Sequence, residues 1–195
     1  MKILAPVSRA DEVEMLVENG AEELYCGVVP KEWLDAYTGA IWLNRRSPAG
    51  ANLESWDSLG ALVDAAHARH VPVFLTLNAP VYNDRQLAAA RDLAKRAAEE
   101  IGVDAFIVSD VGLLLTMAEL RLPARLHISS VASTLNGEAL GFYGDLGASR
   151  VILPRALSVG EIARLVGAVA GALLLHLVPY PLLVPAALLL VVILL

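Results

Sequence analysis

The regular alternation of short apolar segments with amphipathic stretches constrains the fold of this chain more than any other feature. Apolar segments rich in Val, Ile and Leu occur at residues 3–7, 23–28, 73–77, 105–109, 126–130, 150–153 and 173–178. Most are apolar at successive positions, which is typical of strands in a parallel sheet that is covered on both faces. We therefore predict about seven parallel strands.

The stretches between these segments have helical periodicity. Residues 56–69 and 85–101 each place apolar side chains on one face and charged side chains on the remainder. Three sequences resemble helix-initiating capping boxes, in which a side chain near the helix start and another three residues later bond each other's backbone. They are Ser8-x-x-Asp11, Asn83-x-x-Gln86 and Ser158-x-x-Glu161.

Glycines mark the transitions from helix to strand. Gly20, Gly102 and Gly147 each follow a helical pattern and precede an apolar segment. Glycine suits the left-handed conformation that commonly ends a helix. The repeated order of strand, capped helix and glycine indicates βα units.

Two α/β architectures share this order, the doubly wound sheet and the (β/α) barrel. The first apolar segment leads into Ala5-Pro6-Val7-Ser8-Arg9, which is not the glycine-rich turn of a dinucleotide-binding sheet. The chain has 195 residues, whereas a complete eight-stranded barrel typically has about 250. We predict an α/β fold, an incomplete TIM-like (β/α) barrel of about seven parallel strands with outer helices.

The chain divides into a barrel portion, residues 1–164, and an apolar tail, residues 165–195, which has no Asp, Glu, Lys or Arg. The tail is long enough for a membrane span, but Pro179, Pro181 and Pro185 interrupt it. A seventh strand at 173–178 with an anomalous end, a membrane segment and a frame-shift product remain open. Membrane contact through the tail is not the favoured interpretation.

Charge and cysteine content limit the partners and the compartment. The formal net charge is −6, which argues against general attraction to nucleic acid but not against a local basic groove. Cys26 is the single cysteine, so the chain contains no disulfide and no CxxC metal site. A reducing compartment fits this content, and we expect a cytoplasmic protein.

In a (β/α) barrel the functional site is built at the carboxyl ends of the strands. Polar residues that follow the predicted strands are candidates for this site. One of them, Asp110, equally suits a helix cap, and another, Asn78, equally suits a turn. Arg155 is not needed by a cap or turn and suits a carboxylate or phosphate. No nucleophile–base pair or metal-ligand spacing is evident, so the catalytic residues stay unidentified and no metal site is predicted. The candidate substrate-binding residues are Asn78, Asp110, Ser130, Asn136 and Arg155.

Six short motifs follow one another along residues 3–164. They are Leu4-Ala5-Pro6, residues 19–27 (NGAEELYCG), Thr76-Leu77-Asn78, residues 107–112 (IVSDVG), His127-Ile128-Ser129-Ser130 with Asn136, and residues 150–158 (RVILPRALS) with Glu161. In this order they resemble the motifs of the U32 peptidase family, also called collagenase-like proteases.

The resemblance implies a barrel-like fold and, by the family's name, a peptidase or other hydrolase. It also implies an alternative, because some members resemble oxygen-independent hydroxylation factors that act on RNA bases or ubiquinone precursors. Those members bind an iron–sulfur cluster through cysteines that begin just after the seventh strand. In this chain His176 is followed by Leu177-Val178-Pro179 and by no cysteine. Such clusters typically need about four thiolates, so we expect no cofactor within this chain.

Two functions therefore remain open. The first is a U32-type peptidase, in which the five candidate residues position a peptide and Arg155 clamps an anionic group. The second is a non-catalytic partner or truncated relative of the hydroxylation factors, with a modified base as substrate. An open barrel leaves unpaired strand edges, so we expect self-association or a related U32-type subunit as partner.

Overall fold

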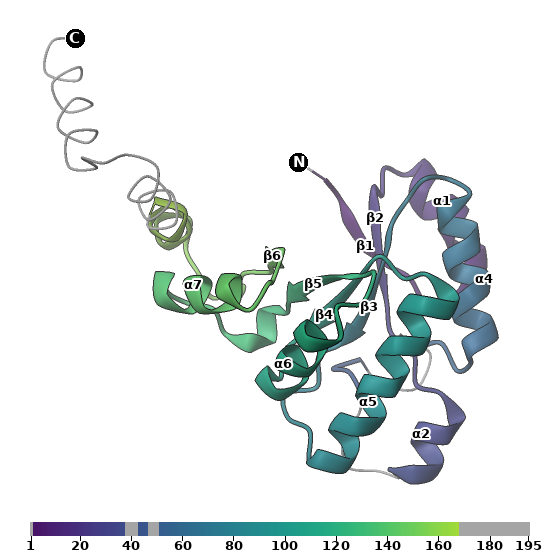
Figure 1. Ribbon diagram of the computed structural model, residues 1–195. Helices are drawn as coiled ribbons and strands as arrows, with labels where there is room; N and C mark the ends of the chain where they lie inside the picture. The colour runs from purple at the N-terminus through teal and green to yellow at the C-terminus, as the bar shows by residue number, and fades with distance from the viewer. Residues whose placement is uncertain (1, 38–42, 47–50, 168–195) are drawn as a thin grey trace, which may run out of the picture.

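The computed structural model describes residues 2–37, 43–46 and 51–167 of the chain. Six strands form one parallel sheet in the order β1-β2-β3-β4-β5-β6. The sheet curls into an open half-barrel (Figure 1), which confirms the predicted incomplete barrel. The predicted strand at 173–178 lies outside the described residues. The strands are β1 Leu4–Pro6, β2 Glu23–Cys26, β3 Val73–Leu77, β4 Ala105–Val108, β5 Arg125–Ile128 and β6 Arg150–Val151.

Helices connect successive strands and cover the outer face of the curled sheet (Figure 1). The α-helices are α1 Val13–Glu18, α2 Lys31–Ala36, α4 Trp56–His67, α5 Asp84–Arg96, α6 Val111–Leu120 and α7 Gly137–Asp145. Two short 3-10 segments are η1 Ala10–Glu12 and η3 Ser130–Ala132, and the π-helical turn η2 spans Ala97–Ile101. Residues 159–167 are also helical.

The two faces of the sheet have different partners, as a barrel requires. Outward-facing side chains such as Leu24, Leu75 and Val108 pack with the helices in the main core. Inward-facing Phe74 and Ile107 belong to a smaller cluster that contains no helical residue. The side chains that face the barrel interior are therefore separate from the helix-packed core.

Local sequence signals define most element boundaries. Asn83 and Gln86 form the predicted capping box of α5, with reciprocal bonds of 2.9 and 3.0 Å. The Ser158 and Glu161 pair also bonds reciprocally. The three predicted left-handed glycines are confirmed, because Gly20, Gly102 and Gly147 have φ of 95°, 85° and 85°.

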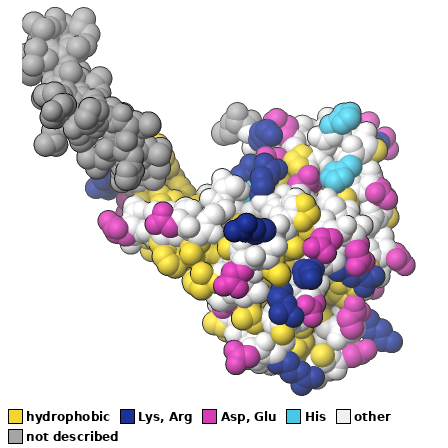
Figure 2. Space-filling model, in the orientation of Figure 1, with side chains coloured by type: hydrophobic (Ala, Val, Ile, Leu, Met, Phe, Trp, Pro, Cys, Tyr) yellow, Lys and Arg dark blue, Asp and Glu magenta, His cyan; other side chains and the backbone are white. Residues whose placement is uncertain are grey.

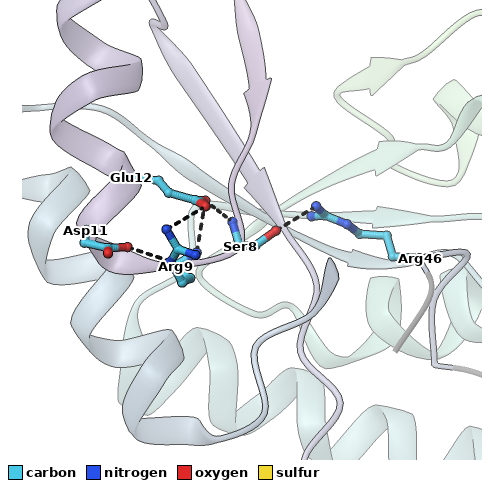
Figure 3. A network of polar contacts seen from close by, with 5 residues as sticks. All are labelled: Ser8, Arg9, Asp11, Glu12 and Arg46. Atoms are coloured by element: carbon cyan, nitrogen blue, oxygen red, sulfur yellow. Dashed lines mark hydrogen bonds and ion pairs between the residues drawn. The ribbon is translucent and has the colours of Figure 1, made fainter. Parts of the chain in front are cut away.

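The predicted capping box at Ser8-x-x-Asp11 is wrong. Glu12, rather than Asp11, accepts hydrogen bonds from the backbone N–H groups of Ser8 and Arg9, at 2.9 and 3.3 Å. The reason is that the first turn begins at Ala10, which shifts the reciprocal position by one residue. The Ser8 hydroxyl points away from Glu12 and accepts a hydrogen bond from the Arg46 guanidinium (Figure 3).

A buried ion pair crosses the barrel interior. The Arg150 guanidinium on β6 donates to both carboxylate oxygens of Glu23 on β2, at 2.6 and 2.9 Å. Only 4% of Glu23 is exposed, and the hydrogen bond from Arg150 holds the pKa of its carboxyl below the usual value. The pair therefore ties the last described strand to the second one across the open barrel.

His127 lies beside this pair and is neutral. Its ring packs edge-on against Phe74, with centroids 4.7 Å apart. Burial, aided by Arg150, lowers the pKa of His127 to about 4. Its Nδ1 has no hydrogen-bond partner among the described residues. A neutral, enclosed imidazole fits a packing role inside the barrel better than a base at the mouth.

The apolar tail is only partly described. The helix over 159–167 runs across the predicted boundary between residues 164 and 165, and residues 168–195 lie outside the described part. Within the described ranges, no helix combines the length and apolarity needed to cross a bilayer. The cytoplasmic location stays a prediction.

Candidate functional site at the barrel mouth

An arginine from the loop after α2 reaches the mouth of the open barrel. The Arg46 guanidinium donates to the carbonyls of Val7 and Tyr25 and to Ser8 Oγ, each at 3.4 Å. It also lies 5.4 Å from the centre of the Tyr25 ring. These hydrogen bonds are long, so the guanidinium keeps capacity to donate to a ligand. Figure 3 shows Arg46 approaching Ser8 from the side opposite Glu12.

Two buried asparagines anchor the backbone of Arg46. Asn44 Oδ1 accepts from the Arg46 N–H at 2.9 Å, and Asn52 Nδ2 donates to the Arg46 carbonyl at 3.3 Å. The two amides also bond each other at 2.9 Å. Gly27, just after β2, lies against both, with no room for a β-carbon. The direction of Arg46 is thus set by its backbone anchors.

Asn78 joins the ends of β3 and β5 to the same loop. Its Nδ2 donates to Ser129 Oγ at 3.1 Å, and its Oδ1 accepts from the Arg45 N–H at 3.0 Å. Its carbonyl accepts from Ser109 Oγ at 3.4 Å. Both polar atoms of the amide are therefore engaged. In this arrangement Asn78 positions the loop that carries Arg46.

The other predicted site residues do not join this network. Asp110 and Asn136 are the N-caps of α6 and α7, accepting from Leu113 N at 2.8 Å and from Ala139 N at 2.9 Å. Ser130 begins η3, and its neighbour Ser129 makes the contact with Asn78. Arg155 is exposed after β6 and pairs with no described residue. Substrate binding by these five residues stays a prediction.

Because Asp110 caps α6, Asp110→Ala is expected to lower the free energy of unfolding by about 1 kcal/mol. The lost bond is the one between Asp110 Oδ1 and the Leu113 N–H. Urea denaturation measures the change, and Asp110→Asn, which keeps an acceptor, is the matched control. A stability equal to that of the unaltered chain would contradict the capping role.

Arg155 is the anion-binding arginine predicted from the sequence, because a cap or turn does not need an arginine, and Arg46 is not among the predicted site residues. The residues around Arg46 nevertheless indicate a fixed loop. Asn44 and Asn52 flank it at short range, and asparagine amides commonly fix loop backbones. Ser129, at the end of an apolar strand, is 3% exposed and was noted only as part of a motif.

The residues present do not fit an iron–sulfur cluster. Cys26 is fully buried among outward-facing core residues, and burial raises the pKa of its thiol to about 12. A cluster is typically held by about four thiolates, and the chain has one cysteine. Within the described ranges, no group of three His, Cys, Asp or Glu side chains is arranged to hold a metal ion.

The described residues also lack the usual machinery of nucleophilic hydrolysis. None of their Ser, Thr or Cys side chains is hydrogen-bonded to a histidine. The hydroxyls nearest the mouth are committed elsewhere, since Ser8 contacts Arg46, Ser129 contacts Asn78, and Ser109 bonds a carbonyl. Covalent hydrolases need a nucleophile within hydrogen-bond reach of a base.

Curated relatives of this chain are RNA-modification proteins. A "tRNA hydroxylation protein P" from Escherichia coli K12 is 33% identical over 51% of this chain and 22% of its own length. The protein of that name from Helicobacter pylori J99 is 25% identical over 83% of this chain and 35% of its length. The "23S rRNA 5-hydroxycytidine C2501 synthase" of Escherichia coli K12 is 27% identical over 83% of this chain and 22% of its length. The chain thus spans roughly a fifth to a third of these proteins.

A solved structure of a U32 peptidase has the same fold. It superimposes with a TM-score of 0.66 over 86% of this chain and 65% of its own, at 15% identity. The model of peptidase family U32 matches residues 8–174. With that match over most of its length, the chain belongs to peptidase family U32.

Proposed function

We propose that this chain is the RNA-recognition part of a U32-family RNA-modification system and holds a nucleotide at the mouth of its open barrel. The named relatives act on tRNA or rRNA, which supports RNA over peptide as the substrate class. The proposed contribution of the described residues is binding and orientation of the nucleotide.

The observation that carries this proposal is the state of Arg46. Its guanidinium lies at the carboxyl ends of β1 and β2, and its contacts are two carbonyls, a hydroxyl and a ring. No carboxylate of a described residue pairs with it. A guanidinium forms short, charge-assisted and often bidentate bonds with phosphate. Arg46 can therefore bind one anionic group at the mouth of the barrel.

The same geometry weighs against peptide hydrolysis. Cys26 is buried with a high thiol pKa, and His127 is enclosed on the inside of the barrel. Neither a nucleophile with its base nor a set of metal ligands is found in the described ranges. A peptidase is supported by the family's name and by the name of the similar solved structure, which at 15% identity shows the fold alone.

The resemblance to the hydroxylation factors implies an iron–sulfur cluster held by about four thiolates, and residues 1–195 contain one cysteine. The redox centre would therefore be supplied by cysteines outside residues 1–195, and the barrel described here would present the base. This division agrees with the open half-barrel, whose β1 and β6 edges are unpaired among the described strands.

Arg46→Ala is expected to weaken tRNA binding by about tenfold, since charge-assisted hydrogen bonds contribute roughly 1.5–3 kcal/mol. The slope of log affinity against log salt is expected to fall by about one. Fluorescence anisotropy with labelled tRNA at several salt concentrations measures both. Arg69→Ala is the control, because Arg69 is an exposed arginine already paired with Glu14 at 2.6 Å.

Equal loss of tRNA affinity in both variants would mean that only overall charge matters and would overturn the assignment of Arg46. Failure of the unaltered chain to bind tRNA, together with cleavage of unstructured peptides, would overturn the proposed function in favour of the peptidase.

A further inference from the structure

A cavity lies outside the barrel, between α2, α4 and α5. Its volume is about 370 Å³, and three aromatic side chains, Trp33, Tyr37 and Trp56, form much of its lining. Volumes of about 300–1,000 Å³ are typical of small-molecule sites. None of the mouth residues lines this cavity, so it is a separate feature of the fold.

The aromatic walls are held in place before any ligand arrives. Trp56 Nε1 donates to Glu32 Oε1 at 2.6 Å, and the Arg96 guanidinium stacks 4.4 Å from the Trp56 ring centre. Trp33 and Tyr37 pack with centroids 4.6 Å apart. Fixed aromatic walls lower the entropic cost of binding a flat ligand.

Charges around the cavity are balanced within the chain. Arg96 pairs with Glu100 at 3.3 Å, and Asp92 pairs with Arg91 at 3.0 Å. Figure 2 shows acidic and basic side chains interspersed over the face that carries α4 and α5. A neutral planar ligand is therefore better matched than a free anion or cation.

The hydrogen-bonding groups of the lining further limit the class of ligand that the cavity can bind. Glu32 and Asp92 line the cavity, and the hydrogen bond from Trp56 holds the pKa of Glu32 below its usual value. An ionised carboxylate accepts several hydrogen bonds. Trp33 is 4% exposed, and its indole N–H has no acceptor among the described residues. A buried donor without an acceptor is uncommon.

We propose that this cavity binds a nucleobase, with an exocyclic amino group directed at Glu32 and Asp92. Bases stack on aromatic side chains and on guanidinium planes. Carboxylates accept hydrogen bonds from base amino groups. The inference goes beyond the proposed function, because it concerns free nucleosides and a cavity separate from the barrel mouth.

Titration of the chain with cytidine, adenosine and uridine tests this site through tryptophan fluorescence excited at the red edge of absorption. Saturable quenching is expected, with cytidine and adenosine binding at least about fivefold more tightly than uridine. Ala89→Phe, which places a ring in the cavity, is expected to weaken binding by about tenfold or more. Ala88→Phe is the matched control, since Ala88 is the exposed neighbour on α5 and does not line the cavity.

Asp92→Ala provides a second variant, at a position whose side chain is 67% exposed. It is expected to reduce the preference for amino-bearing bases. Absence of saturable quenching, equal affinity in Ala89→Phe and Ala88→Phe, or tighter binding of choline than of any nucleoside would overturn the proposal. Arg46→Ala separates the two sites, because it should weaken tRNA binding while nucleoside quenching persists.

Discussion

Arg150→Met is expected to lower the free energy of unfolding by about 2–3 kcal/mol at neutral pH, because it leaves a buried carboxylate without its partner. Glu23 would keep only Lys2, whose Nζ lies 3.7 Å from Oε1 and whose side chain is 60% exposed. Methionine retains the apolar contact with the Phe74 ring, over which the guanidinium now lies at 5.3 Å. Urea denaturation at pH 7 measures the change.

The decrease in unfolding free energy caused by Arg150→Met should depend on pH. In the unaltered chain the pKa of Glu23 is held below its usual value. The pair therefore contributes stability above the unfolded pKa of about 4.3, and that contribution is lost as the pH falls through the lower, folded-state pKa. The difference between Arg150→Met and the unaltered chain should be largest at neutral pH and should narrow below about pH 4.

Arg69→Met is the matched control for this prediction. Arg69 and Arg150 have equal side-chain exposure, 36%, and equal shortest distances to their carboxylates, 2.6 Å. They differ in the partner, since Glu14 is 65% exposed and Glu23 is 5% exposed. An exposed pair contributes less than about 1 kcal/mol. Equal losses of unfolding free energy in the two variants would contradict the view that the Glu23–Arg150 pair stabilises the barrel more than an exposed pair does.

Gly27→Ala is expected to destabilise the chain by about 1–3 kcal/mol through overpacking. The added β-carbon would overlap Asn52 Oδ1 and would lie 2.7 Å from Asn44 Nδ2. Those two amides anchor the Arg46 backbone, so the variant should also lose affinity for tRNA. Thermal unfolding and anisotropy on the same sample measure both effects.

Gly60→Ala distinguishes this steric effect from a general glycine effect. Gly60 lies within α4, and a β-carbon there meets nothing within 4 Å. Alanine is favoured over glycine in helices by up to about 1 kcal/mol, so this variant should be slightly more stable. A neutral result for Gly27→Ala, with tRNA binding intact, would mean that the Asn44–Asn52 pair does not direct Arg46.

Most secondary structure was predictable because it depends on near neighbours. The strand at Val73–Leu77 begins and ends where the apolar pattern does, and Asn83 starts α5 through bonds to a residue three positions away. The strand at Arg150–Val151 is shorter than predicted. The Ile152 N–H still donates to the Ile128 carbonyl of β5 at 2.9 Å, but the described pairing with β5 ends there. Periodicity alone therefore overestimates the length of the strand.

The site was less predictable because one residue type serves several purposes at the end of a strand. Asp110 and Asn136 have the polarity of a ligand and the position of an N-cap, and the structure places both as caps. Asn78 does reach the mouth, where its amide positions the loop of Arg46. A side chain after a strand can satisfy its own helix or a distant loop, and sequence spacing is the same in both cases.

The βα order, the capping boxes of Asn83 and Ser158 and the left-handed glycines follow from the sequence alone, because they depend on periodicity and on backbone preferences within a few residues. Which distant side chains come into contact depends instead on the tertiary fold. Glu23 and Arg150 are 127 positions apart, and Arg46 enters the mouth from a long loop. Both contacts exist because the curled parallel sheet brings non-adjacent strands to face one another across its interior.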